Sequence, residues 1–331
     1  MKRLLLYYSV FILLISQVWG QDPHYSQFFM APQLLNPATT GSASSDWRIM
    51  SNYRQQWDNA ETPFSTFSLT METKLAGKEK GENTIGSSLT LMADRSLYGA
   101  FKSVYASSAI AYHVQLAVKH RLGLGIHASY GNRRIDYSQL TFGTQFTSRG
   151  FDVSLPSGEN SLATMKPFVS LGAGLLYNFH TEYFNLDVGY SRFHLNKPLQ
   201  SFIADPQQKI PLRYVAHMNM EYILSRSLLI NVNVAYQKQA TQQYYAAGGA
   251  LGLDISGGDR NKIFFAGAWY RQEDAIYPYI SLLIGNVQMG VSYDVTVSKQ
   301  NLGPSNPRTI ELSMVVKKGQ NILGVIPCPW K

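Results

Sequence analysis

Apolar and polar residues alternate with a period of two along most of the chain after residue 46. Between Val287 and Val297, every odd position is apolar and every even position is polar or glycine. The same period recurs at 184–191, 214–222 and 230–237. Segments of about ten residues with one apolar and one polar face are typical of membrane barrels, where one face meets lipid and the other a polar lumen. A soluble sandwich shows the same alternation, usually in shorter strands.

Fourteen segments of this kind can be distinguished, and they begin near residues 47, 64, 84, 101, 120, 167, 183, 212, 227, 244, 262, 276, 287 and 308. The connections at 132–166, 195–211 and 299–307 are long, whereas 115–119 is one of several tight turns between them. Long loops on one rim and short turns on the other are typical of bacterial outer-membrane proteins. We therefore predict an all-β fold: a 14-stranded antiparallel transmembrane outer-membrane β-barrel over residues 46–317. Both chain ends would lie on the periplasmic, short-turn side.

Residues 1–20 have the features of a secretory signal peptide. Two basic residues precede an apolar run over 4–15, and Val18 and Gly20 occupy the positions that mark a cleavage site. We expect the mature chain to begin at Gln21. The later apolar runs are too short for a membrane-spanning helix, which needs about 18 residues or more.

Residues 21–45 are rich in aromatic residues, poor in charge and interrupted by three prolines, which restrict any helix to short turns. We predict a plug-like segment that occupies the lower lumen as one or two short helical turns, because a barrel of this size is wider than its own side chains can fill. A mobile N-terminus is the alternative. The residues expected to form the plug against the lumen wall are Tyr25, Phe28, Phe29, Leu34, Leu35, Asn36 and Pro37.

The composition agrees with this class and argues against several others. Only 15% of residues are charged, 13% are aromatic, and the chain contains 26 Gly and 21 Tyr. Without Lys2 and Arg3, 27 basic and 21 acidic residues remain, with no Lys/Arg block of the nucleic-acid-binding kind. The seven His residues show no metal-ligand spacing, and no GxSxG sequence marks a catalytic serine. We expect no enzymatic activity, no cofactor and no metal site.

Two regions are candidates for contact with a partner protein. The long loop at 137–166 is either a lid over the lumen or a docking surface, because loops of this length in compact folds are usually functional or disordered. The periplasmic C-terminal tail, residues 318–331, holds the only cysteine, which excludes an intramolecular disulfide. The residues expected to contact a partner are Phe142, Phe146, Phe151, Cys328 and Trp330.

Several stretches follow one another in a recognisable order. The mature start reads QDPHYSQFF and continues to LNPATTG at 35–41. YRQQW at 53–57, IDYSQLTFG at 135–143 and FHLNKP at 193–198 come next. LRY at 212–214 with His217 follows, and Cys328-Pro329 lies near the end. This series resembles the PorP/SprF family, outer-membrane proteins of the type IX secretion system in Bacteroidetes, over essentially the whole mature chain. The final Trp330-Lys331 departs from the ending usual in that family.

The resemblance implies a non-enzymatic barrel in the lipid bilayer of the outer membrane. It would serve as anchor or translocation partner for a secreted surface protein that carries a type IX C-terminal sorting domain, such as a gliding adhesin. Periplasmic and outer-membrane components of the type IX machinery are implied as further partners, and nucleic acid is not. The tripeptide Asn36-Pro37-Ala38 also resembles one in the N-terminal plug of FadL-like transporters. The alternative function is therefore a channel for small hydrophobic molecules.

Overall fold

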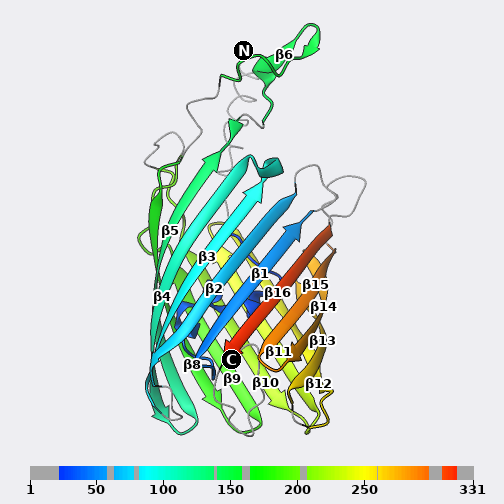
Figure 1. The fold of residues 1–331 in the computed structure, drawn as a ribbon. Coiled ribbons are helices and arrows are strands. Elements are labelled where there is room, and N and C mark those ends of the chain that lie inside the picture. The colour runs from blue at the N-terminus through cyan, green and yellow to red at the C-terminus, as the bar shows by residue number, and fades with distance from the viewer. Residues whose placement is uncertain are drawn as a thin grey trace, which may run out of the picture.

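Within the described part of the chain, fourteen long strands close into an antiparallel barrel (Figure 1). The computed structural model describes residues 22–57, 63–77, 82–137, 140–158, 165–201, 207–258, 260–297 and 308–318. Successive barrel strands are neighbours, and the first strand pairs with the last to close the cylinder. The prediction of a 14-stranded outer-membrane barrel is confirmed. No helix in these ranges is long and apolar enough to cross a membrane.

Every barrel strand begins within two residues of its predicted start. The strands are β1 (Trp47–Gln56), β2 (Phe64–Ala76), β3 (Thr84–Ser96), β4 (Phe101–Ala117), β5 (His120–Ile135), β8 (Phe168–His180), β9 (Phe184–Phe193), β10 (Arg213–Ile223), β11 (Leu228–Gln239), β12 (Gln242–Asp254), β13 (Lys262–Arg271), β14 (Ala275–Ile284), β15 (Val287–Thr296) and β16 (Arg308–Lys318).

The two-residue period of the sequence becomes the two faces of the wall. In β15 the side chains of Gln288, Ser292 and Asp294 are buried on the lumen side, whereas Met289 and Val295 are about half exposed on the outer side. The outer face is therefore apolar and the inner face largely polar, as a wall between lipid and a hydrated or filled lumen requires.

The two rims of the barrel differ. We call the rim that carries the connections 136–167, 194–212 and 297–307 the long-loop rim, and the opposite one, with two-residue turns at 118–119 and 285–286, the short-turn rim. The long-loop rim is uneven, because β11 joins β12 and β13 joins β14 there through only two and three residues. As Figure 1 shows, β3, β4 and β5 rise higher than β12–β14, so this rim has a high side and a low side.

The first long loop carries a small element that the sequence did not indicate. After the 3₁₀ turn η5 (Gly143–Gln145), the strands β6 (Phe146–Thr147) and β7 (Gly150–Phe151) form a two-stranded hairpin. Figure 1 shows it beyond the high side of the long-loop rim. Two-residue strands show no measurable periodicity, which is why the alternation pattern missed them.

Three short turns make up the N-terminal segment, by which we mean residues 22–45. These are η1 (Phe28–Met30), α2 (Pro32–Leu35) and η2 (Pro37–Thr39); another turn, η3 (Leu97–Gly99), joins β3 to β4. Pro32 and Pro37 each open a turn, where a missing N–H costs nothing. Asn36 between them is extended, as expected before proline, and its side chain caps η2 by accepting from the N–H of Ala38 at 2.9 Å.

The N-terminal segment runs down the inside of the barrel (Figure 1). At its start, the N–H of Asp22 donates to the side chain of Gln239, the last residue of β11 on the long-loop rim. At its end, the N–H of Asp46 donates to the carbonyl of Lys318, the last residue of β16 on the opposite rim. We expected this segment in the lower lumen, with its start near the short-turn rim. The structure instead extends it to the low side of the long-loop rim, because its first residues bind strand ends there.

Candidate functional site

Aromatic packing fixes the upper half of the N-terminal segment against β13 and β14. The ring of Phe29 stacks on Trp269 at 4.4 Å between centroids and meets Tyr279 edge-on at 5.4 Å. Phe28 packs edge-on against Phe29, and both rings are almost fully buried. Burial of each such side chain contributes about 1.5–3 kcal/mol before the cost of ordering the segment is subtracted.

Paired charges on the neighbouring strands β15, β16 and β1 bind the same segment. The N–H groups of Ser26 and Gln27 donate to the two carboxylate oxygens of Glu311 at 2.6 and 2.8 Å. The hydroxyl of Ser26 donates to Asp294 at 2.6 Å. Arg54 lies 3.3 Å from Glu311 and 3.8 Å from Asp294, so both buried carboxylates have a cationic partner. Hydrogen bonds to carboxylates are stronger than neutral ones, and here N–H donors attach the segment to β16 and a hydroxyl donor attaches it to β15.

Glycines in the wall make room for Asn36. A Cβ atom on Gly174 would lie 2.0 Å from Oδ1 of Asn36, and one on Gly189 would lie 2.6 Å from its Nδ2. The amide of Asn36 donates to the carbonyl of Leu175 at 2.8 Å and lies 3.1 Å from Nε2 of His217. We call these wall residues the Asn36 socket. Only glycine at 174 and 189 allows the amide to approach the strands so closely.

The next residues of the segment pass just as close to the wall. A Cβ atom on Gly125 would lie 2.3 Å from the nitrogen of Ala38. A Cβ atom on Gly86 would lie 2.5 Å from Cα of Gly41, whose own φ of +73° also favours glycine. His113 reaches the carbonyl of Thr40 at 2.8 Å. The lower half of the segment is therefore held by shape and by hydrogen bonds, and the upper half by aromatic rings and charges.

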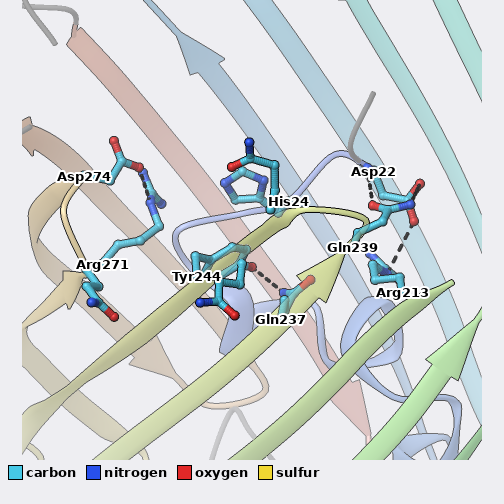
Figure 2. Close-up of a pocket in the computed structure, with 11 residues that line it drawn as sticks. Asp22, His24, Arg213, Gln237, Gln239, Tyr244, Arg271 and Asp274 are labelled. Carbon is cyan, nitrogen blue, oxygen red and sulfur yellow. Dashed lines mark hydrogen bonds and ion pairs between the residues drawn. The ribbon is translucent and has the colours of Figure 1, made fainter. Parts of the chain in front are cut away.

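A cavity of about 190 Å³ lies where the N-terminal segment meets the low side of the long-loop rim (Figure 2). We call it the rim cavity. The carboxylate of Asp22 lies 2.7 Å from Nε2 of His194 and 3.4 Å from Nε of Arg213. Across the cavity, Arg271 donates to Asp274 at 2.5 Å. The residues that line it are Asp22, His24, Arg213, Gln237, Gln239, Gln242, Gln243, Tyr244, Arg271, Gln272 and Asp274.

The two titratable residues that the N-terminal segment contributes to the rim cavity have fixed protonation states at neutral pH. Burial alone would raise the pKa of Asp22, but His194 and Arg213 more than offset it and hold that pKa well below its usual range. Burial lowers the pKa of His24 well below its usual value, and the positive charges of Arg54 and Arg271 lower it further. Asp22 is therefore ionised and His24 neutral.

The residues expected to form the plug are found together inside the barrel. Tyr25, Phe28, Phe29, Leu35, Asn36 and Pro37 are buried there. Leu34 is only half-buried, and its carbonyl accepts from Arg213 at 3.0 Å. Whether these residues close the lumen to solutes stays a prediction.

The residues expected to contact a partner lie elsewhere. Phe146 is 71% exposed and Phe151 45% exposed, and their rings face each other across the β6–β7 hairpin at 6.4 Å. Phe142 is half-buried beside Tyr137. Cys328 and Trp330 fall outside the described residues, as do the expected signal peptide and the expected tail after Lys318, which itself ends β16.

Sequence reasoning placed Arg213 on the inner face of the wall, but it assigned no residue of the wall to the binding of the segment. His194 and Arg213 bind Asp22, and Gly174 and Gly189 form the Asn36 socket. His194 belongs to the FHLNKP stretch that carried the family resemblance, so a weak signal was present without a role attached to it. Gly174 and Gly189 could not be singled out from the sequence, because glycine is common throughout the chain.

Among the described residues, no group of three or more His, Cys, Asp or Glu side chains is placed to hold a metal ion. The family model for the type IX secretion system membrane protein PorP/SprF matches residues 18–316. No curated protein sequence matches the chain.

Solved structures of hydrocarbon channels share the barrel. The TodX deltaS2S3 mutant, a monoaromatic hydrocarbon channel, is 10% identical and has a TM-score of 0.55, covering 86% of this chain and 93% of that one. The TodX deltaS2 mutant is 11% identical with a TM-score of 0.54, over 88% and 94% of the two chains. The toluene transporter TodX of Pseudomonas putida is 10% identical with a TM-score of 0.51, over 91% and 98%. At such low identity the likeness concerns the fold alone.

Proposed function

Because this chain belongs to the PorP/SprF family of type IX secretion system membrane proteins, we propose that it anchors, or helps to translocate, a secreted surface protein with a type IX C-terminal sorting domain. The family and the fold are those of outer-membrane barrels of secretion and channel type, which are not enzymes. We propose the same non-enzymatic character for this chain, and periplasmic and outer-membrane components of the machinery as further partners.

The occupied lumen is the observation that carries this proposal. The N-terminal segment binds β15 and β16 through Glu311 and Asp294, and β8–β10 through Asn36 and Asp22. A barrel whose lumen is occupied in this way offers its rims to a partner, rather than a wide pore. We propose that the long-loop rim faces the cell exterior, as long loops of outer-membrane barrels do.

We propose the β6–β7 hairpin as the contact with the secreted protein. Its Phe146 and Phe151 expose apolar surface beyond the rim, together with Val153, which is 72% exposed. Exposed apolar surface of this kind marks interaction sites on soluble faces. Phe142, which contacts Tyr137 just before the hairpin, is proposed as a further part of this surface. The tail with Cys328 and Trp330 is proposed to contact a periplasmic component.

The experiment compares two variants in cells that express the tagged secreted partner. Phe146→Ser with Phe151→Ser removes the exposed rings, while Val118→Ser removes an even more exposed side chain, 84%, at the short-turn rim. We expect the double variant to lose crosslinks to the partner and to release it into the medium, and Val118→Ser to behave like the wild type. Normal surface display and crosslinking in the double variant would exclude the hairpin as the contact.

A channel for small hydrophobic molecules is the second candidate function. It is favoured by the apolar side chains that β13 and β14 turn into the lumen, such as Trp269, Phe265 and Leu283. Phe28 and Phe29 of the N-terminal segment already pack into this apolar cluster, and the rim cavity above it is polar. A deletion strain separates the two functions: a channel would be needed for uptake of a hydrophobic growth substrate, and an anchor for display of a surface protein.

A further inference from the structure

Glutamine side chains dominate the rim cavity. Gln237 and Gln239 stand at the end of β11, Gln242 and Gln243 begin β12, and Gln272 lies in the turn between β13 and β14. Gln237 and Gln239 are each only 6% exposed, so they are built into the wall rather than free at the surface. Figure 2 shows Gln239 beside Asp22 of the N-terminal segment, and Gln237 directed toward Tyr244 of β12.

The charges around the cavity cancel in pairs. Arg213 has Asp22 as its partner at 3.4 Å, and Arg271 has Asp274 at 2.5 Å and Asp294 at 2.9 Å. A charged ligand would have to break one of these pairs and leave its partner uncompensated in a half-buried site, which is costly. The cavity therefore favours a neutral ligand.

The remaining polar groups suit hydroxyl groups. A glutamine amide both donates and accepts, as a hydroxyl does. The amide nitrogen of Gln237 donates to the hydroxyl of Tyr244, and among the described residues no hydrogen bond to its carbonyl oxygen is found. The neutral ring of His24 lies 5.1 Å from the ring of Tyr244, and no hydrogen bond to the His24 ring occurs among the described residues. Amides that surround a pair of rings can bind a polyol through its hydroxyls and its C–H face together.

The size of the cavity limits the ligand to one small ring. Its volume of about 190 Å³ corresponds to about six water molecules. It is smaller than the roughly 300–1,000 Å³ of pockets for drug-sized ligands. An extended peptide would need further pockets for alternate side chains, and the only aromatic surface on offer is that of His24 and Tyr244.

We propose that the rim cavity binds a single neutral sugar unit, one hexose or N-acetylhexosamine, either free or at the end of a glycan. The site goes beyond the proposed secretion function and does not depend on it. Asp22 and His24 come from the N-terminal segment, whereas the glutamines come from the wall. The site is therefore complete only while the segment is in place, and a bound sugar favours that state.

The test is saturation-transfer NMR on the purified full-length barrel with glucose, galactose and N-acetylglucosamine as probes. The detergent must have no sugar headgroup, since maltosides and glucosides would compete. We expect transfer to at least one sugar, weakened about tenfold by Gln237→Leu, which keeps the volume but removes the amide. Gln272→Ala, at an exposed turn, should weaken binding without disturbing the fold, and Gln115→Ala at the short-turn rim should leave it unchanged.

Heat-modifiable gel mobility verifies that each variant is folded. Transfer to none of the sugars by the folded wild type would overturn the proposal, as would equal transfer in Gln272→Ala and Gln115→Ala. A triglycine probe that binds more tightly than any sugar, and is lost in Gln272→Ala, would assign the cavity to a peptide instead. Competition by a glycan ending in the bound sugar, at lower concentration than the free sugar, would identify a glycan as the source.

Discussion

Single residues decide whether the N-terminal segment stays inside the barrel. Asn36 satisfies three groups at once: the N–H of Ala38, the carbonyl of Leu175 and the ring of His217. At the rim, Asp22 likewise has three partners: its carboxylate binds His194 and Arg213, and its backbone N–H donates to Gln239. A buried polar group that loses its partner costs about 1–3 kcal/mol, so Asp22 stabilises the upper end of the segment and Asn36 its lower half.

Acid should loosen the segment through His24. Its pKa is well below the usual value when the segment is in place, and about 6.5 when it is released. The released segment binds a proton below that pH and the docked one does not, so docking is strongest above about pH 6.5. It weakens below that by at most about 1.4 kcal/mol per pH unit. Asp22, with its lowered pKa, adds a second loss only below about pH 4.

Labelling measures this dependence. In a Cys328→Ser background, Ser26→Cys should react with a maleimide increasingly faster, relative to a free thiol standard, as the pH falls from 7.5 to 5. His24→Gln should flatten the pH dependence, because glutamine does not titrate. If the labelling rate depended on pH in the same way with His24 and with Gln at position 24, a group other than His24 would control docking of the segment.

At the scale of elements, strand and segment fit each other through the wall glycines. Gly174 in β8 and Gly189 in β9 leave space for one amide, and Gly125 in β5 leaves space for the backbone after it. These positions face the lumen, where any other residue would project into the segment. These glycines are therefore explained by the space that the N-terminal segment needs, rather than by the pairing of the strands.

Gly174→Ala should expel the segment while the barrel still forms. The added Cβ would lie 2.0 Å from Oδ1 of Asn36, which is too close for either group to keep its place. Alanine itself is tolerated in a strand, so the ladder from β5 to β9 should persist. We expect single-channel conductance in planar bilayers to rise severalfold, toward that of a variant lacking residues 22–41. Gly143→Ala, at a site with open space, should conduct like the wild type.

Wild-type conductance in a folded Gly174→Ala barrel would contradict the prediction that the Asn36 socket keeps the segment inside the lumen. A rise only in the deletion variant would mean that the segment closes the lumen without depending on Asn36.

The barrel strands were largely predictable from the sequence, but the path of the segment inside the barrel was not. Alternation in stretches such as 287–297 follows from the two faces of a strand, so strand starts could be read to within two residues. The path of the segment depends on pairs such as Asp22 with Gln239, which are 217 positions apart, and no local pattern encodes such a pair. Prolines predicted that the turns of the segment would be short, but gave no direction along the lumen.

At the scale of the whole molecule, the informative feature is the direction in which the N-terminal segment runs through the barrel. The segment enters at the low side of the long-loop rim, descends to Asp46, and the chain then reverses into β1. β1 therefore runs up the wall beside a segment that ran down the lumen. The first described residue and the start of the first strand lie at opposite rims.

A tag placed directly before Asp22, after the expected cleavage site, should reveal this direction. With the long-loop rim outside, a short FLAG-type epitope should be labelled by antibody on intact cells, and an epitope after Lys318 should be labelled only after the outer membrane is opened. A folded fluorescent protein at the first position should abolish assembly, because it cannot pass the lumen. Labelling of the first epitope only in opened cells would place the start of the segment at the periplasmic rim.

The same geometry constrains how the barrel is made. β1 and β16 pair along ten residues to form the last seam, and the segment that immediately precedes β1 already lies within the ring that this seam closes. Glu311 of β16 binds the backbone of Ser26 and Gln27, so the final strand recognises the first stretch of the chain as well as its neighbour. The folded barrel thus encloses a segment of its own chain, and we expect closure of the seam and binding of this segment to be coupled during assembly.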